Sequence, residues 1–236
     1  MPIAPESNSA VLTLLGYPAK YHGGRGPLEG KGIGANFKDG MLGLRCNFAT
    51  SSDGKSLVDR RVARNLTSNE AAELADAINK KVRLSKGRFF FKASVAHRAV
   101  LTIEANKKLS ANITNTDPAY RMHKGIAEAL KEFEMKVKRC EPLDESENAK
   151  LSAELVNEFT EKSFVVLNRH PVNIKREKKR LLKANTIISR DPGNFVPKLW
   201  SISKKYGKKW AIFADMPLEI GIGKLAGMDV IALPTP

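Results

Sequence analysis

The chain is poor in cysteine and histidine. Its 236 residues include two cysteines, Cys46 and Cys140, and four histidines. The cysteines lie far apart in the sequence, so they form no metal-binding or redox motif, and so few thiols fit a reducing cytoplasm. None of the histidines has an Asp, Glu or Cys at the spacing of a metal-ligand pair. The residues therefore predict no metal site built from this chain alone.

Long apolar runs are also missing. No run approaches the ~18 residues that a membrane span needs. The N-terminal Met-Pro-Ile-Ala-Pro-Glu lacks the basic and apolar pattern of a secretion signal. We therefore expect a soluble cytoplasmic protein with no membrane partner. The apolar content of 42% predicts a folded chain with one large α/β domain or two smaller ones.

Acidic residues are few relative to basic ones. The chain has 25 Asp and Glu against 40 Lys and Arg, a net charge of +15. Such a field concentrates anions, so phosphate compounds and nucleic acids are both candidate partners. An acidic tail or an acidic partner domain would explain the excess equally well. Nucleic acid ranks second, because the basic residues are dispersed, aromatic residues make up only 7%, and no RNA- or DNA-binding motif is present.

Sequence patterns predict a mixed order of strands and helices. Residues 1–36, rich in Gly and Pro, indicate a long ordered loop around one short helix near Ser9–Leu15. Apolar periodicity and one capping box predict the following elements: strands at 42–48, 88–94, 98–104 and 187–188, and helices at 67–81, 124–139 and 145–168. The strand at 42–48 is expected to be half-buried, with Arg45 and Asn47 on its polar face. The last forty residues predict a helix at 197–206 and then a strand, a helix and a parallel strand at 210–214, 217–226 and 228–233.

The segment from Arg176 to Gly193 carries the first functional signal. It passes from a basic, helix-like stretch through Asn185 and a short apolar strand to Arg190, beside a Gly turn. The planar guanidinium matches phosphate or carboxylate oxygens, and a Gly turn lets the backbone approach a ligand. This pattern favours a site for a small phosphorylated acid.

Several other polar residues leave two interpretations open. Ser7 precedes an apolar helical run, where a serine can be a nucleophile or simply the helix N-cap. Arg60, Arg61 and Arg64 follow a strand-like segment and indicate either a solvated basic face or a ligand site. Charged residues also stand at strand ends, where α/β proteins often collect ligand contacts: His97, Arg98 and Asp117.

Eight short motifs in order carry a resemblance along nearly the whole chain. They are Leu15-Gly16-Tyr17-Pro18, Gly24-Arg25-Gly26-Pro27-Leu28-Glu29, Arg45-Cys46-Asn47-Phe48-Ala49-Thr50, Asp59-Arg60-Arg61, His97-Arg98-Ala99-Val100-Leu101, Asp117-Pro118, His170-Pro171-Val172-Asn173 and the segment through Arg190. With these motifs the chain resembles the archaeal-type cofactor-independent phosphoglycerate mutases, a branch of the alkaline phosphatase superfamily.

The resemblance implies a fold and an activity. It implies α/β architecture in which residues 37–190 form an inserted α+β substrate domain, flanked by pieces of an alkaline-phosphatase-like core at 1–36 and 191–236. It also implies a glycolytic isomerase that interconverts 3-phosphoglycerate and 2-phosphoglycerate through a phosphoserine. Ser7 would accept the phosphoryl group and bind divalent metal, Mn or Mg, and Asp117 would serve the glycerate hydroxyls. The groups holding the glycerate would be Arg61, His97, Arg98, Asn185 and Arg190.

Departures from the family pattern limit that expectation. The flanking family segments that carry the other Asp and His metal ligands have no counterpart here, and Glu6 and Glu219 bring negative charge near an arriving phosphate. We therefore expect that this chain alone does not retain the metal and has little or no mutase activity. A complementary chain or a homo-oligomer would cover the core pieces. The alternative function is a non-catalytic basic protein that binds RNA or another polyanion on the mutase insert.

Overall fold

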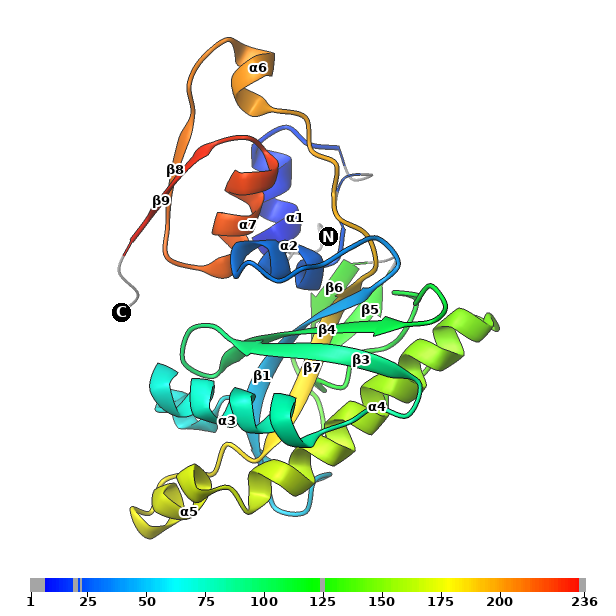
Figure 1. The fold of residues 1–236 in the computed structure, drawn as a ribbon, viewed down its shortest axis with the longest axis vertical. Helices are drawn as coiled ribbons and strands as arrows, with labels where there is room; N and C mark the ends of the chain where they lie inside the picture. Colours follow the sequence, from blue (N-terminus) through cyan, green and yellow to red (C-terminus); the bar gives the residue numbers. More distant parts are fainter. Residues whose placement is uncertain (1–6, 19–20, 22, 124–125, 234–236) are drawn as a thin grey trace.

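A central antiparallel sheet organises the lower half of the molecule (Figure 1). The computed structural model describes residues 7–18, 21, 23–123 and 126–233. Strand β1 lies between β4 and β7, β3 pairs with β4 at one edge, and β2 pairs with the end of β1. The strands are β1 (Leu42–Ser51), β2 (Leu57–Asp59), β3 (Gly87–Ala93), β4 (Arg98–Ala105) and β7 (Thr186–Gly193).

Helices cover one face of this sheet. The main hydrophobic core lies between the sheet and α3 (Ser68–Lys81) and α4 (Glu147–Asn168), and α5 (Pro171–Lys178) follows α4. The predicted capping box is confirmed: the Thr67 hydroxyl accepts a hydrogen bond from the Glu70 backbone amide, and the Glu70 carboxylate accepts one from the Thr67 amide. Local sequence signals therefore determined where α3 begins.

A second, smaller unit lies above the sheet (Figure 1). Its strands β8 and β9 run parallel with α7 between them, as the sequence predicted. It comprises α1 (Ser7–Leu14), α2 (Arg25–Gly32), α6 (Ile202–Tyr206), β8 (Ala211–Ala214), α7 (Pro217–Leu225) and β9 (Asp229–Ala232). Its own hydrophobic cluster includes Leu12, Leu28 and Leu218. A short helix, η2 (Val62–Arg64), and a hairpin of β5 (Tyr120–His123) and β6 (Ile126–Ala129) complete the described elements.

Two predicted helices are wrong. The region predicted as a helix at 124–139 contains β6 and then irregular chain, because its backbone bonds to distant segments: Leu130 donates to Ala119, and Val137 donates to Lys55. In the predicted helix at 197–206, only Ile202–Tyr206 is helical. Conversely, the predicted loop at 1–36 contains a helix that was not predicted, α2. Its three glycines have low helix propensity and gave no helix signal.

Two strands also differ from expectation. The predicted Gly turn beside Arg190 is wrong, since β7 continues through Gly193 with a bulge in its pairing to β1 near Asp191, whose φ is 55°. Strand β1 was expected to be half-buried, but all ten of its residues are buried. One reason is α2, which packs against β1, while Leu57, Ile188 and Val137 pack around Ala49 near the end of the strand.

Helix α2 approaches neighbouring backbones too closely for a side chain at Gly26. A Cβ there would lie 2.2 Å from the carbonyl carbon of Gly43. We expect Gly26→Ala to lower the free energy of unfolding by about 2–3 kcal/mol, the upper range for overpacking, because the opposing atoms are backbone. Thermal melts should show this loss. Gly30→Ala is the matched control, since its nearest neighbours would lie 3.9–4.0 Å away; equal destabilisation by both changes would contradict the prediction.

Candidate functional site

An arginine-lined pocket of about 560 Å³ lies where the two units meet. Side chains from α1, α2, β1, β4, β7, the β5–β6 hairpin and the start of α7 line it. Six of them are arginines: Arg25, Arg45, Arg61, Arg64, Arg98 and Arg190. In the part of the chain that the structure describes, Glu219 is the only carboxylate in this lining. The pocket therefore suits a ligand that carries more than one negative charge.

Strand register brings these charges together. Leu44 and Cys46 point into the core, so Arg45 and Asn47 lie on the opposite face of β1. Across the ladder, Arg45 stands opposite Arg190 of β7 and Asn47 stands opposite Arg98 of β4. Like charges directly opposite each other destabilise a sheet. A site that retains them needs anions nearby.

One buried carboxylate meets part of that need. Glu29 Oε1 accepts a hydrogen bond from Arg25 Nε at 2.5 Å and lies 3.5 Å from Arg45 Nε. Burial, followed by the charge of Arg190, lowers the pKa of Arg45 to about 10, and burial also lowers the pKa of Arg98. Arg190 is also paired with the buried Asp117 and Asp191, and Glu219 lines the pocket, so four carboxylates lie among six guanidinium groups and positive charge remains in excess. A phosphate or carboxylate ligand would relieve it.

His97 is held neutral at the edge of this cluster. Burial lowers its pKa to about 3, and the charges of Arg98 and Arg45 add to the effect. Within the described residues its Nδ1 has no hydrogen-bond partner, and the same is true of Asn47 Oδ1. Unpaired buried polar atoms are costly, so both atoms are candidates for hydrogen bonds to a bound molecule.

The low pKa of His97 predicts a pH-dependent stability. The unfolded state takes up a proton near pH 6.5 and the folded state only near pH 3. The stability from neutral His97 is therefore present above about pH 6.5 and is lost as pH falls toward 3. In His97→Gln, the slope of unfolding free energy against pH between 4 and 6 should fall by up to about 1.4 kcal/mol per pH unit. Chemical denaturation at each pH measures the slope; an NMR titration of His97 with a midpoint near 6.5 would contradict the assignment.

Most of the predicted site residues line this pocket. They are Ser7, Arg61, His97, Arg98 and Arg190. Ser7 is exposed and is the first residue of α1, and its hydroxyl lies 3.4 Å from Arg25 Nη1. The preceding Glu6 lies outside the described residues. The structure thus places the expected phosphoryl acceptor at the mouth of a basic cavity.

Asp117 and Asn185 lie elsewhere. Asp117 does not line the pocket: its carboxylate accepts two hydrogen bonds from Arg60, at 2.8 and 2.6 Å, and lies 3.7 Å from Arg190 Nη1. Asp117 is therefore placed to orient Arg190 from outside the pocket lining. The Asn185 side chain joins the backbone of Ser51 to Asn168 and is buried away from the cavity.

The lining also contains residues outside the predicted site set, among them Arg25, Arg45, Asn47 and Tyr120. The alternation in β1 marked Arg45 and Asn47 as one polar face, but that face was assigned to solvent. Tyr120 supplies a ring whose centroid lies 3.9 Å from the Arg190 guanidinium carbon, a cation–π contact that helps fix the arginine.

A divalent metal does not fit the described residues. Across the part of the chain that the structure places, no three His, Cys, Asp or Glu side chains are grouped to hold a metal ion. In the pocket, Glu29 is engaged with arginines and His97 faces several of them. A cation placed there would be repelled, so the described residues of the pocket do not suit a divalent metal.

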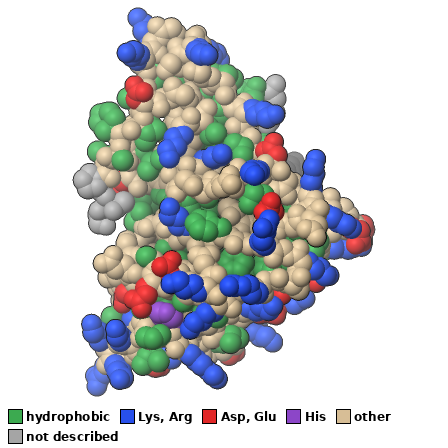
Figure 2. Space-filling model, in the orientation of Figure 1, with side chains coloured by type: hydrophobic (Ala, Val, Ile, Leu, Met, Phe, Trp, Pro, Cys, Tyr) green, Lys and Arg blue, Asp and Glu red, His purple; other side chains and the backbone are tan. Residues whose placement is uncertain are grey.

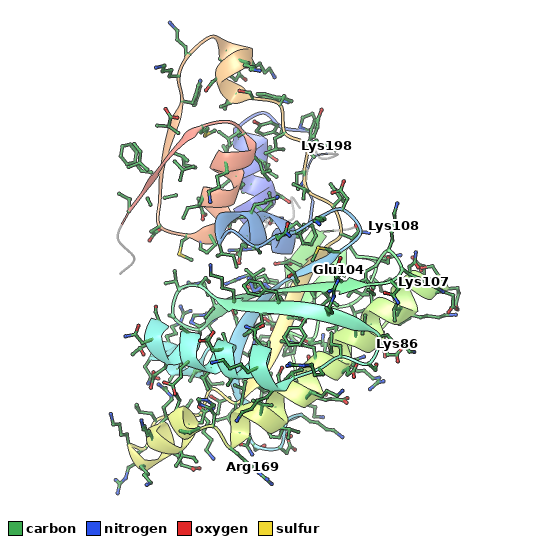
Figure 3. The ribbon with its side chains drawn as sticks, viewed as in Figure 1. Lys86, Glu104, Lys107, Lys108, Arg169 and Lys198 are labelled. Carbon is green, nitrogen blue, oxygen red and sulfur yellow. The ribbon has the colours of Figure 1, made fainter. Side chains whose placement is uncertain are left out.

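A larger recess of about 820 Å³ lies between the β3–β4 hairpin and α4. Most of its charged side chains are paired with one another, including Lys86 with Glu154 and Arg88 with Glu104. Figure 3 labels Lys86, Glu104 and Lys107 around it. Its charges are already matched, so it is a weaker candidate for an anion.

No helix in the described ranges is long and apolar enough to cross a membrane.

Comparison with known proteins identifies the family. The family model described as 2,3-bisphosphoglycerate-independent phosphoglycerate mutase matches residues 2–173. The chain belongs to this family. It is 44% identical over 234 residues to the mutase of that name from Aeropyrum pernix, covering 97% of this chain and 55% of the relative. The Methanosphaera stadtmanae mutase is 40% identical, with 98% and 53% covered.

A solved structure supports the same assignment. The cofactor-independent phosphoglycerate mutase from Thermoplasma acidophilum superimposes with a TM-score of 0.65 at 33% identity, covering 96% of this chain and 57% of that one. The resemblance in the sequence motifs and the mixed α/β fold are thereby confirmed. This family member spans about half the length of the curated mutases that it matches.

Proposed function

We propose that this mutase-family chain binds 3-phosphoglycerate and 2-phosphoglycerate in the arginine pocket. The observation that carries the proposal is the convergence of six arginines and a neutral histidine on one cavity. Both ligands carry a phosphate, a carboxylate and a hydroxyl. Arginines can pair with the two anionic groups, while neutral His97 and Asn47 can hydrogen-bond the hydroxyl.

Ser7 is the proposed phosphoryl acceptor of the complete reaction. Its Oγ would form a bond to phosphorus while the bond from phosphorus to the glycerate oxygen breaks, and the proton lost by the Ser7 hydroxyl would go to the freed oxygen. After the glycerate reorients, the oxygen of its other hydroxyl would bond to phosphorus while the bond to Ser7 Oγ breaks, and the proton that this hydroxyl loses would go to Ser7 Oγ. Arg25, next to Ser7, would offset charge on the transferred group. Asp117 would act through Arg190, as a positioning group.

The proposed division of the chain follows its two cores. An inserted substrate domain at 37–190 lies between core pieces at 1–36 and 191–236 in this proposal. Its support is that the larger hydrophobic cluster uses residues between Leu42 and Ile187, while the cluster around Leu12, Leu28 and Leu218 uses residues from both flanks. The arginine pocket draws on both.

Binding without turnover is the expected behaviour of this chain. Calorimetry should detect 3-phosphoglycerate at micromolar to millimolar concentrations, and the ligand should raise the melting temperature. A coupled mutase assay with added Mn²⁺ or Mg²⁺ should stay at background, because the described residues supply no metal site. Glycerate without its phosphate is the control ligand. Absence of binding at millimolar 3-phosphoglycerate would overturn the proposal, and ordinary turnover would overturn the expected inactivity.

Glu219 is expected to weaken ligand binding. It lines the pocket, burial raises the pKa of its carboxyl, and its Oε2 has no hydrogen-bond partner in the described structure. Glu219→Gln removes one like charge, so affinity for 3-phosphoglycerate should rise about fivefold, the effect of roughly 1 kcal/mol. Calorimetry would measure it. Glu154→Gln, which changes an exposed carboxylate in the remote recess, should leave affinity unchanged.

A further inference from the structure

The segment from Phe195 to Ala214 has a composition unlike the rest of the chain. Its twenty residues include five lysines and five aromatic residues but no Asp or Glu, and both tryptophans of the chain lie in it. The aromatic residues are Phe195, Trp200, Tyr206, Trp210 and Phe213. Aromatic residues are only 7% of the whole sequence. The arginine pocket uses none of these side chains.

The aromatic rings form a continuous row that reaches solvent. Trp200 packs on Tyr17 with centroids 4.2 Å apart, Tyr206 lies 6.2 Å from Trp200, and Trp210 lies 5.9 Å from Tyr206. The inner end belongs to the hydrophobic cluster of the upper unit. At the outer end, Tyr206 is 50% exposed and Trp210 is 38% exposed. Large exposed aromatics in one row mark an interaction surface.

Unmatched lysines surround these rings. The five are Lys198, Lys204, Lys205, Lys208 and Lys209, and all are exposed. No carboxylate of the described residues forms an ion pair with any of them, while Lys205 Nζ lies 3.9 Å from the Trp200 ring centroid. Figure 3 places Lys198 on the segment that climbs from β7 to α6, and Figure 2 shows Lys and Arg side chains at this upper end.

We propose that this basic aromatic surface, residues 195–214, binds single-stranded RNA. Unpaired bases expose ring faces that stack on aromatic side chains regardless of sequence, and lysines act as mobile point charges for the phosphates between them. A duplex hides its base faces, so the exposed rings would add nothing there. A small phosphate ester would leave most of the row unused. Single-stranded RNA uses both the charges and the rings.

A second basic region provides an internal comparison. Residues 169–183, around α5, hold seven Lys and Arg and one Glu but no Phe, Tyr or Trp. It lies at the opposite end of the molecule from α6 (Figure 1). If charge alone attracted RNA, both ends would contribute equally. If stacking contributes, the α6 end dominates.

The test uses fluorescein-labelled oligouridine RNA with the intact chain. Binding should be saturable, should weaken with salt, and should quench the intrinsic fluorescence, because both tryptophans lie in the surface. Lys204→Gln/Lys208→Gln/Lys209→Gln should weaken binding at least tenfold and reduce the salt dependence. The matched control, Lys175→Gln/Lys178→Gln/Lys179→Gln, removes the same charge at α5 and should change affinity less than twofold.

Stacking is tested separately from charge. Tyr206→Ser/Trp210→Ser should weaken binding at least tenfold, and Tyr206→Phe/Trp210→Phe should restore it. Circular dichroism melts verify that each variant is folded. The proposal is overturned if the wild type shows no saturable RNA binding, or if the α5 control loses as much affinity as the α6 variant. It is also overturned if duplex RNA or heparin binds as tightly as the single-stranded RNA, or if DNA of the same sequence binds more tightly than the RNA. All of these variants should still bind 3-phosphoglycerate, so a loss of RNA binding can be told apart from damage to the arginine pocket.

Discussion

Replacing Arg61 and Arg98 together by alanine is expected to weaken 3-phosphoglycerate binding at least a hundredfold. Both side chains line the pocket, and no carboxylate in the described part of the chain forms an ion pair with either. A hydrogen bond to a charged group contributes about 1.5–3 kcal/mol, so losing one from each arginine predicts that change. Because each arginine repels its neighbours, the melting temperature of the free protein should stay constant or rise. Calorimetry and thermal melts measure the two effects.

The matched control removes the same charge elsewhere. Arg88→Ala/Arg139→Ala takes away two exposed arginines, each in a surface ion pair of small energetic value. If this control weakens binding as much as the pocket variant, the general positive field attracts the ligand and the pocket does not. If the pocket variant binds normally, Arg61 and Arg98 do not contact the ligand and the proposed site is wrong.

Much of the fold could be predicted where the signal is local. The Thr67–Glu70 capping box, the alternation in β1 and the helix-starting Pro217 each depend on a few neighbouring residues. The helix predicted at 124–139 failed because its apolar residues have mixed spacing, and long-range backbone pairing decides between helix and strand. Helix α2 was missed for a related reason: close packing of Gly26 on Gly43 and of Gly32 on Pro217, not helix propensity, explains two of its three glycines.

The candidate site was predicted in part. His97 and Arg98 begin a strand, which marked them as ligand candidates, and both line the pocket. Arg45 was missed, because an arginine on a strand face normally points to water, and only the packing of α2 encloses it. Asn185 was selected for its place in a basic segment, yet its amide is used to join Ser51 and Asn168. Sequence shows which side chains can bind an anion, whereas packing decides which of them face a cavity.

Arg176→Met is expected to destabilise the protein by about 3 kcal/mol, the lower end of the range for breaking a buried charge pair, because the partner Glu70 keeps part of its exposure. Arg176 opens the basic segment that first suggested an anion site, but it is 1% exposed and serves the fold. Its Nε donates to Leu182 O at 2.8 Å and its Nη1 donates to Glu70 Oε2 at 2.8 Å. Methionine keeps much of the volume but leaves these acceptors without their donor. Urea denaturation and a melting temperature lower by about 6–12 °C would record the loss.

The ligand pocket should not respond to this change. Arg176 does not line the pocket, so the folded fraction of Arg176→Met should bind 3-phosphoglycerate with wild-type affinity. Lys178→Met is the matched control, an exposed residue of the same helix whose loss should change stability by less than about 0.5 kcal/mol. Equal destabilisation by both would mean that charge near α5 matters and the buried contacts do not. Weaker binding of 3-phosphoglycerate by folded Arg176→Met would indicate that Arg176 contributes to the anion site. A purely structural residue would change the folding equilibrium and not the affinity.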